Sequence, residues 1–437
     1  MPIRPNLVLL HSHDTGRHLG CYGAGVATPN LLRLAREGVL FRQAFCASPG
    51  CSSSRASLMT GQWAHTHGLI GLTHRGWRMN DSRKSHLSHL LRDAGYTTQL
   101  IGFQHEVPDP GELGYSGVIS NESLDFHSRA RGAAAVKWIE NAPAQPFFLN
   151  VGFVETHRTF LPAEPPDDER FTAPLPWMPD VAEVRRDVAE LNTAVRHVDD
   201  AVGAVVSALE KRGLLENALV IYTTDHGVPF PRAKATLFDA GIGVAVVMRG
   251  PGGLSGGQAI DALVSQIDVL PSFFELAGLP LPPGVQGSSF LPLAQRKASA
   301  VRDEIFAEIT YHAAYDPARC IRTPFFKFIR HFADFPKMPM GNVDDGSAKT
   351  FVTGHGYPRL ARPREMLFDL VADPQEFENL AGVPEYANEK AELSRRLQEW
   401  MEKTNDPVLH TGHVPMPPGA VVTPYHYYGP MTEKKPE

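Results

Sequence analysis

The chain has 437 residues, of which 43% are hydrophobic and 21% charged, and this globular composition is enough for one large α/β domain and a smaller one. A formal net charge of -6, spread along the chain, excludes the basic surface of a nucleic-acid-binding protein, while small charged metabolites stay open as substrates. No apolar run spans a membrane, no signal peptide precedes the first predicted strand, and the four cysteines lack disulfide-framework or zinc-knuckle spacing, so we expect a cytoplasmic protein without a membrane partner.

The first predicted element is a short apolar strand over residues 6–11, which runs into the polar side chains of His13 and Asp14 and then into Gly16. A strand that ends in polar side chains and a glycine is how α/β enzymes place ligands at the carboxyl edge of a parallel sheet. We therefore expect His13 and Asp14 to face a cleft. The alternative is a strand-end cap or a surface turn.

The segment 49–61 places Cys51 four residues before Arg55, in a stretch of small residues that can start a helix. At a helix N-terminus, unpaired N–H groups and the helix dipole favour an anion beside Cys51, and Arg55 lies one turn along on the same face. The pattern predicts that a tetrahedral oxyanion rests against both side chains. The alternative is that Cys51 is a small buried hydrophobic residue.

Amphipathic helices are predicted at residues 31–37, 85–94 and 181–211, and they alternate with strand-like runs through about residue 300. Such alternation predicts a parallel-rich sheet flanked by helices. Residues 162–179 are rich in proline and acidic side chains, so we expect a surface loop there, beside the site.

A second apolar strand is predicted at residues 218–224, and it leads into Asp225 and His226. Because a parallel sheet brings such strand ends together, this pair and the pair of His13 and Asp14 predict an oxygen and nitrogen site for a divalent cation. Each pair alone fits a strand-end cap or a surface turn. Both pairs, with the Cys51 segment between them, favour the site.

The pattern changes after a Pro/Gly stretch near residues 282–284 and a polar segment at 294–300. Strand-like runs at 304–310, 319–323, 325–331 and 366–370, then a helix near 388–403, predict a smaller antiparallel subdomain. We therefore divide the chain into a catalytic domain, 1–302, and a C-terminal subdomain, 303–437. The tail at 406–430, with His410, His413 and His426, is expected to fold over the cleft, to serve as an oligomer arm or to be an ordered surface tail.

The segment 49–61 resembles the signature of the type I sulfatases of the alkaline phosphatase superfamily, in which the cysteine of a Cys-x-Pro/Ala-x-Arg core is oxidised to formylglycine, the catalytic nucleophile. Ser53 stands where that signature usually has Pro or Ala. The resemblance implies that a formylglycine-generating enzyme converts Cys51. It also implies an alkaline-phosphatase-like fold, with a large mixed, mostly parallel sheet flanked by helices and a smaller C-terminal antiparallel sheet.

Other segments are similar to the heparan N-sulfatase branch of this family, namely residues 28–31, 41–45, 61–68 and 225–231. Residues 367–380 resemble the C-terminal subdomain of the sulfatases. By this resemblance Asp14, Asp225 and His226 hold one divalent metal ion, with His13 at the position of a first aspartate and Cys51 beside them. One carboxylate fewer and one imidazole more than the family's usual set shift the expected ion from calcium, which stays open, towards manganese or zinc.

Three further residues receive roles from the resemblance alone. Lys234, nine residues past Asp225, stands where the branch has a basic residue that faces the sulfate. His105 matches the histidine of the family's Gly-Lys-x-His segment, and Phe103 replaces its lysine. His157 follows a strand, like the family's histidine that binds sulfate or protonates the leaving group. The alternatives are a solvated surface lysine and a structural histidine.

Together these residues predict a metal-dependent hydrolase of sulfate esters or sulfamates that acts on a small anionic substrate. Arg55 and Lys234 would hold charge, and His105 or His157 would protonate the leaving group. The main alternative is a phosphodiesterase or phosphonate monoester hydrolase on the same fold, because a tetrahedral oxyanion and an Asp/His metal site serve both chemistries. A catalytically silent binding protein with unmodified Cys51 is the second alternative, and a homo-oligomer stays open.

Overall fold

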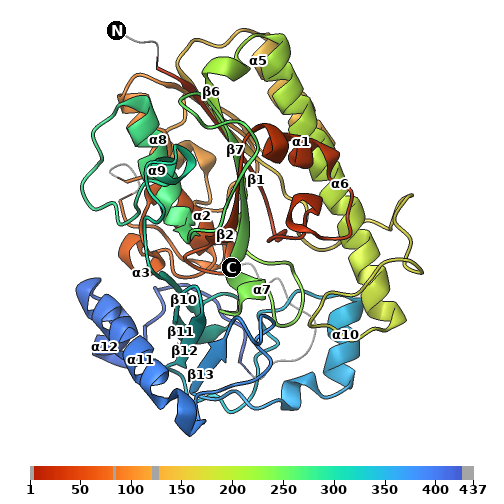
Figure 1. The fold of residues 1–437 in the computed structure, drawn as a ribbon, viewed down its shortest axis with the longest axis vertical. Helices are drawn as coiled ribbons and strands as arrows, with labels where there is room; N and C mark the ends of the chain where they lie inside the picture. Colours follow the sequence, from red (N-terminus) through yellow and green to blue (C-terminus); the bar gives the residue numbers. More distant parts are fainter. Residues whose placement is uncertain (1–3, 82–84, 121–126, 426–437) are drawn as a thin grey trace.

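The first strand of the chain, β1 (Asn6–Ser12), lies in the middle of a nine-stranded sheet (Figure 1). The computed structural model describes residues 4–81, 85–120 and 127–425. The strand order is β4-β3-β5-β1-β6-β7-β2-β8, and β9 pairs with β2. Their bounds are β2 (Val39–Phe45), β3 (Thr97–Gly102), β4 (Gly117–Ser120), β5 (Phe147–Gly152), β6 (Ala218–Thr224), β7 (Gly243–Arg249), β8 (Gln258–Ile260) and β9 (Val264–Ser265).

Parallel pairing dominates the part of this sheet around β1. β1 pairs in parallel with β5 and β6, and β3 pairs in parallel with β5 and β4, whereas β7 is antiparallel to both of its neighbours, β6 and β2. The register sets His11 opposite Gly152 of β5 and Thr223 of β6. The carboxyl ends of β3, β5, β1 and β6 therefore meet at one edge of the sheet.

Side chains of β1 alternate between the two faces of the sheet, and every residue of the strand is buried. Leu7 and Leu9 belong to the hydrophobic cluster on one face of the sheet, and Val8 and Leu10 belong to the cluster on the opposite face. A strand that is apolar on both faces requires a layer of helices on each side, which the chain supplies.

Two layers of helices cover the sheet (Figure 1). Those that pack on the face of Val8 are α1 (Pro29–Glu37), α5 (Ser128–Glu140), α6 (Ala182–Lys211) and α10 (Ser347–Gly354). Those that pack on the face of Leu7 are α2 (Cys51–Thr60), α4 (Leu87–Asp93), α8 (Val269–Ala277) and α9 (Leu291–Ala294). Two short helices, α3 (Ala64–His67) and α7 (Asp239–Ile242), complete this part of the chain.

A second sheet of four antiparallel strands follows, in the order β10-β11-β12-β13. Its elements are β10 (Ile305–Tyr311), β11 (Tyr315–Arg322), β12 (Phe326–His331), β13 (Glu365–Asp369) and the helices α11 (Ala387–Lys403) and α12 (Pro407–Thr411). α11 packs on this sheet through Leu393, Leu397 and Trp400. The predicted fold class is confirmed, whereas the boundary at residue 302 stays a prediction.

Most predicted elements differ from the observed ones by one or two residues at their ends. β11 is the exception, because it begins four residues before the predicted start, at Tyr315. Asp316 and Pro317 interrupt the apolar pattern there, yet Tyr315 still pairs with Tyr311 of β10. The predicted loop at 162–179 contains no helix or strand and lies along α6, where Asp167 pairs with Arg196 at 2.7 Å.

The tail of the chain returns to the larger domain. The amide of Val421 donates to the carbonyl of Arg75, and the amide of Thr423 donates to the carbonyl of Ala313 at 2.6 Å. His410 bonds Asn405 at the surface, whereas His426 lies outside the described residues. Within the described part of the chain, no helix combines the length and apolarity that a membrane crossing requires.

Candidate active site

Most of the predicted site residues come from four strand ends and one helix start, whereas Lys234 lies in a turn between β6 and α7. His13 and Asp14 follow β1, and Asp225 and His226 follow β6. His157 lies beyond β5 and His105 beyond β3, at the same edge of the sheet. Cys51 is the first residue of α2, after the extended N-cap Gly50. Parallel pairing therefore brings together residues that lie up to about half the chain apart in sequence.

Five of these side chains form one buried cluster, which consists of His13, Asp14, Cys51, Asp225 and His226. Their potential ligand atoms all lie within 4.8 Å of one another. Oδ1 of Asp14 is 2.7 Å from Nδ1 of His13 and 3.1 Å from Nε2 of His226. The predicted convergence of the two strand-end pairs is therefore observed in the structure, with Cys51 beside them.

The two carboxylates of this cluster are held ionised. Burial opposes the charge of Asp225, but the neighbouring His226 and Arg55 outweigh it and hold its pKa at about 2. Burial also opposes the charge of Asp14, whose pKa is nevertheless lowered, chiefly by Lys234. Burial lowers the pKa of His13 well below its ordinary value, so this imidazole is neutral and offers a lone pair.

This donor set fits a divalent metal ion. Two ionised carboxylates and two imidazoles converge within ligand distance, and mixed oxygen and nitrogen donors suit transition metals better than they suit calcium. Asp14 gives one oxygen to Lys234 and turns the other to the histidines, so a cation-facing oxygen remains. His13, Asp14, Asp225 and His226, with Cys51 at the rim, are the residues that would hold the ion.

Arg55 lies below the cluster and is 1% exposed. Its Nε and NH2 groups donate to Oδ2 of Asp225 at 3.2 and 3.0 Å, and NH1 contacts Nδ1 of His11 at 2.5 Å. The guanidinium also lies over the ring of Phe103, 4.9 Å from its centroid. In this arrangement Arg55 positions Asp225, and its predicted contact with an oxyanion stays a prediction.

Lys234 connects the cluster to the C-terminal part of the chain. Its ammonium is 2.7 Å from Oδ2 of Asp14 and 2.6 Å from Oδ2 of Asp344, and the side chain is 1% exposed. Burial disfavours this charge, but the two carboxylates outweigh it and raise the pKa of Lys234. Lys234 is thus not a solvated surface lysine. Asp344, which sequence reasoning missed, lies in an acidic loop before α10 that carries no distinguishing pattern.

The two predicted histidines lie at different distances from His13. The ring of His157 stands edge-on to that of His13, with 4.6 Å between centroids, and its ligand atom lies within 4.8 Å of those of Asp14 and Asp344. His105 pairs with His74 instead, at 2.8 Å between Nε2 and Nδ1. His157 therefore borders the metal-ligand cluster, whereas the ring of His105 lies farther from that of His13, with 6.4 Å between centroids.

Cys51 has two histidine neighbours. Its Sγ is 3.2 Å from Nε2 of His226 and 4.0 Å from Nε2 of His312. Burial raises the pKa of the Cys51 thiol well above its ordinary value, so the unmodified side chain is a neutral thiol. His312 belongs to the turn between β10 and β11, 261 residues along the chain from Cys51, and no motif in the sequence marks it.

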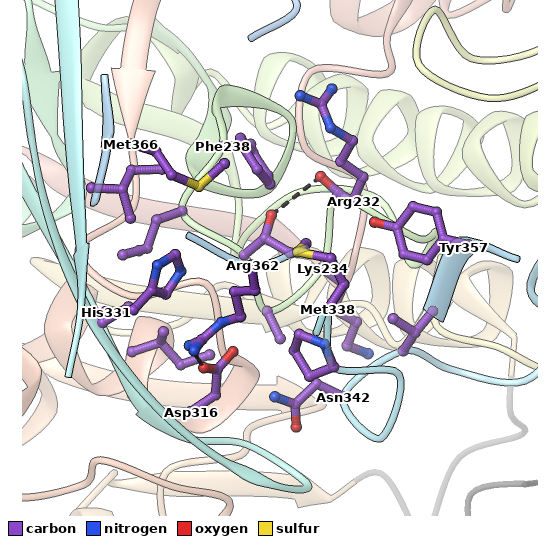
Figure 2. A pocket seen from close by; sticks show the side chains of 18 residues that line it. Arg232, Lys234, Phe238, Asp316, His331, Met338, Asn342, Tyr357, Arg362 and Met366 are labelled. Carbon is purple, nitrogen blue, oxygen red and sulfur yellow. Dashed lines mark hydrogen bonds and ion pairs between the residues drawn. The ribbon is translucent and has the colours of Figure 1, made fainter. Parts of the chain in front are cut away.

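An enclosed pocket of about 30 Å³ lies beside Lys234, between residues 232–238 and the C-terminal sheet (Figure 2). Arg362 and Asp316 pair there, and Asn342 and His331 border the space. Such a volume holds a water molecule or two and no sugar ring.

Comparison with known proteins agrees with this geometry. The sulfatase family model matches residues 5–279, and the model of the C-terminal part of N-sulphoglucosamine sulphohydrolase matches residues 231–345. The N-sulphoglucosamine sulphohydrolase of Homo sapiens is 29% identical over 92% of this chain and 91% of its own length. An ulvan-active sulfatase of Formosa agariphila is 27% identical over 93% of this chain and 76% of its own length.

The fold has relatives among solved structures as well. A protein solved in complex with its substrate D-glucosamine-2-N,6-O-disulfate has a TM-score of 0.70 and 20% identity, and the match covers 92% of this chain and 99% of that one. At this identity the likeness concerns the fold alone.

Proposed function

The chain belongs to the sulfatase family and hydrolyses sulfuric esters, and we propose that its substrate is a sulfated carbohydrate carrying a sulfate ester or a sulfamate. The proposal rests on the placement of Cys51 at the N-terminus of α2, 3.2 Å from His226 and within the buried ligand set. The relatives named for N-sulphoglucosamine and ulvan support a sugar as the leaving group.

Conversion of Cys51 to formylglycine, by a formylglycine-generating enzyme, is part of this proposal. Ser53 stands at the position of the usual Pro or Ala. Its hydroxyl forms a hydrogen bond with the hydroxyl of Ser48 at 2.9 Å and donates to the carbonyl of Gly50 at 3.1 Å, so it is engaged within its own turn. The side chain thus stabilises the turn that presents Cys51. A neutral buried thiol is a poor nucleophile, which favours a modified side chain for catalysis.

A bound divalent cation would supply Lewis acidity towards the sulfuryl oxygens and lower the pKa of the nucleophile. The side chains of the protein set the charge of the metal ligands and supply the proton for the leaving group. Lys234 and Arg55 keep Asp14 and Asp225 ionised for the cation. His157 borders the ligand set, so we place it as the group that gives a proton to the leaving oxygen or nitrogen, while His105 supports the pocket wall through His74.

Substitution of Cys51 by alanine tests the proposal directly. We expect Cys51→Ala to abolish turnover of an aryl sulfate and of N-sulfoglucosamine, while the free energy of unfolding changes by no more than about 2 kcal/mol, because a small side chain is exchanged at a helix start. Cys46→Ala is the matched control, since Cys46 is also a buried thiol but packs in the hydrophobic cluster. Full activity of Cys51→Ala would contradict the assignment.

The two alternatives give different results in the same assays. A phosphodiesterase or phosphonate hydrolase would turn over aryl phosphodiesters or phosphonates faster than the sulfated compounds. A silent binding protein would turn over neither and would keep a thiol, which intact-mass spectrometry separates from the aldehyde because conversion lowers the mass by roughly 18 Da. The cytoplasmic location and a homo-oligomer are further parts of the proposal, to be checked by cell fractionation and by light scattering.

A further inference from the structure

His312, in the turn between β10 and β11 of the C-terminal sheet, lies near Cys51, and no motif anticipated it. The ring is 2% exposed, and Nε2 lies 4.0 Å from Sγ of Cys51. A Cβ atom on Gly50, the N-cap of α2, would lie 3.5 Å from Cδ2 of His312. The imidazole is therefore beside the N-terminus of α2, where helix geometry already favours an anion.

Three separate segments fix the turn that carries this ring. The amide of Tyr311 donates to the carbonyl of Ile70 at 3.0 Å, and the amide of Ala314 donates to Oδ1 of Asn342 at 2.7 Å. Thr423 of the tail donates its amide to the carbonyl of Ala313. The residues on both sides of His312 are thus anchored, so the ring has a defined position without any bond from its own Nδ1.

That Nδ1 atom is buried and has no hydrogen-bond partner among the described residues. A buried acceptor without a partner is less costly than a buried N–H without one, because unpaired acceptors are the commoner exception in proteins. The arrangement therefore favours the tautomer with the proton on Nε2, which points that N–H towards Cys51.

The cations near Cys51 have most of their donors engaged. Arg55 contacts Asp225, His11 and the carbonyl of Ser12, and Lys234 gives two of its three N–H groups to Asp14 and Asp344. A tetrahedral sulfuryl group held at Cys51 exposes several oxygens that each need a donor in a water-free pocket. Nε2 of His312 lies within reach of such an oxygen.

We propose that His312 donates the N–H of Nε2 to a sulfuryl oxygen of the substrate held at Cys51, which makes it a catalytic residue supplied by the C-terminal sheet. This inference rests on the proposed function, because it needs a sulfuryl group at Cys51. It involves no proton transfer and no covalent step of His312. The hydrogen bond strengthens as negative charge develops on the sulfuryl oxygens in the transition state.

Three substitutions of His312 test the inference on the metal-loaded protein. Glutamine can place an N–H near the position of Nε2, whereas asparagine places it near Nδ1 and alanine removes it. We expect His312→Ala and His312→Asn to lower kcat/KM for an aryl sulfate by about 100-fold and to weaken the binding of inorganic sulfate, measured by calorimetry, by about 10-fold or more. His312→Gln should retain most of both.

His331→Gln is the matched control, since His331 is a histidine of the same sheet whose Nδ1 already contacts the carbonyl of Pro363 at 2.9 Å. It should leave both measurements unchanged. Wild-type sulfate affinity in folded His312→Ala, or equal losses in the glutamine and asparagine variants, would overturn the inference while leaving the sulfatase assignment intact. A wild-type protein that neither hydrolyses sulfated compounds nor binds sulfate would overturn both.

Discussion

The charged residues of the site form buried ion pairs. Lys234 lies between Asp14 and Asp344, and Arg55 holds Asp225, so each carboxylate that would face a metal ion is paired with its own buried cation. Pairing of this kind keeps both carboxylates ionised in a dry environment, where an unpaired charge would be neutralised.

Loss of Lys234 should therefore cost both stability and activity. Lys234→Met leaves Asp14 and Asp344 buried without their cation, so we expect the free energy of unfolding of metal-free protein to fall by about 3 to 5 kcal/mol. Loss of one charge-stabilising contact should lower kcat/KM by about 100-fold. Urea denaturation and steady-state kinetics measure the two effects.

Lys349→Met is the control for that substitution. Lys349 pairs with Asp345, whose side chain is 47% exposed and stays hydrated after the change. A loss of about 1 to 2 kcal/mol is expected, because the ion pair has a solvated partner and only one further hydrogen bond, from Lys349 to the carbonyl of Val343 at 2.8 Å, is removed. Equal losses in the two lysine variants would contradict the role given to Lys234.

His13 should decide which metal ion activates the enzyme. Because an imidazole replaces a carboxylate at this position, we expect manganese or zinc to restore the highest rate to chelated protein and calcium the lowest. His13→Asp should shift the order towards calcium. Metal analysis of protein purified without chelator, followed by reconstitution, checks the prediction, and calcium as the best activator of the wild type would refute it.

At the scale of elements, a second buried cluster joins helix α3 to the C-terminal sheet. His65 of α3 contacts Oε1 of Glu308 of β10 at 2.8 Å, and Arg319 of β11 contacts Asp406, the N-cap of α12, at 2.5 Å. The distance between Arg319 and Oε2 of Glu308 is 3.5 Å. The guanidinium lies between both carboxylates, so this cluster is already charge-balanced and serves as a structural connection.

This cluster predicts how stability depends on pH. Burial alone would raise the pKa of Glu308, but His65 and Arg319 hold it at about 2, below its ordinary value of 4.5. The contribution of Glu308 is therefore complete above pH 4.5 and is lost as the pH falls towards 2. Burial lowers the pKa of His65, but Glu308 outweighs it and raises this pKa above 6.5, so the contribution of His65 is complete below pH 6.5 and is lost as the pH rises through the raised value.

Glu308→Gln tests that dependence. We expect it to lower the free energy of unfolding at pH 6 by about 3 kcal/mol, since each pKa unit corresponds to about 1.4 kcal/mol. The decrease in the free energy of unfolding between pH 4.5 and pH 2 should also become smaller. Glu304→Gln, in the loop just before the same strand, removes a half-buried pair with Arg396 and should leave the slope unchanged. If the free energy of unfolding of Glu308→Gln fell between pH 4.5 and pH 2 as steeply as that of the wild type, the prediction would be contradicted.

At the scale of the whole molecule, the two sheets share one hydrophobic cluster. Ile305, Ala307 and Ile309 of β10 belong to the same buried cluster as Phe45 of β2 and Leu58 of α2. A chain that ended at the predicted boundary would expose this apolar surface to water. The C-terminal sheet is therefore part of the main core.

We expect the full chain to unfold in a single cooperative transition, because the two sheets share this core and because His65 of α3 is paired with Glu308 of the C-terminal sheet. Scanning calorimetry measures it, and agreement of the calorimetric and van't Hoff enthalpies is the criterion. Two separated transitions would show that residues 1–302 and 303–437 are independent folding units.

The sequence by itself determined the local features and the fold class. The two apolar runs that end in His13 and Asp14 and in Asp225 and His226 predict strand ends at a sheet edge. Such a prediction is possible because side-chain periodicity and strand ends are properties of short segments. The same holds for Cys51 at its helix start, and for the helices and strands whose ends were predicted within a few residues.

Only the tertiary structure decided which groups meet. His312 approaches Cys51, Asp344 shares Lys234 with Asp14, and Arg55 turns away to hold Asp225, and none of these contacts is visible in the chain order. The physical reason is that such contacts join segments up to 261 residues apart, whose approach depends on how the two sheets pack and not on any local pattern.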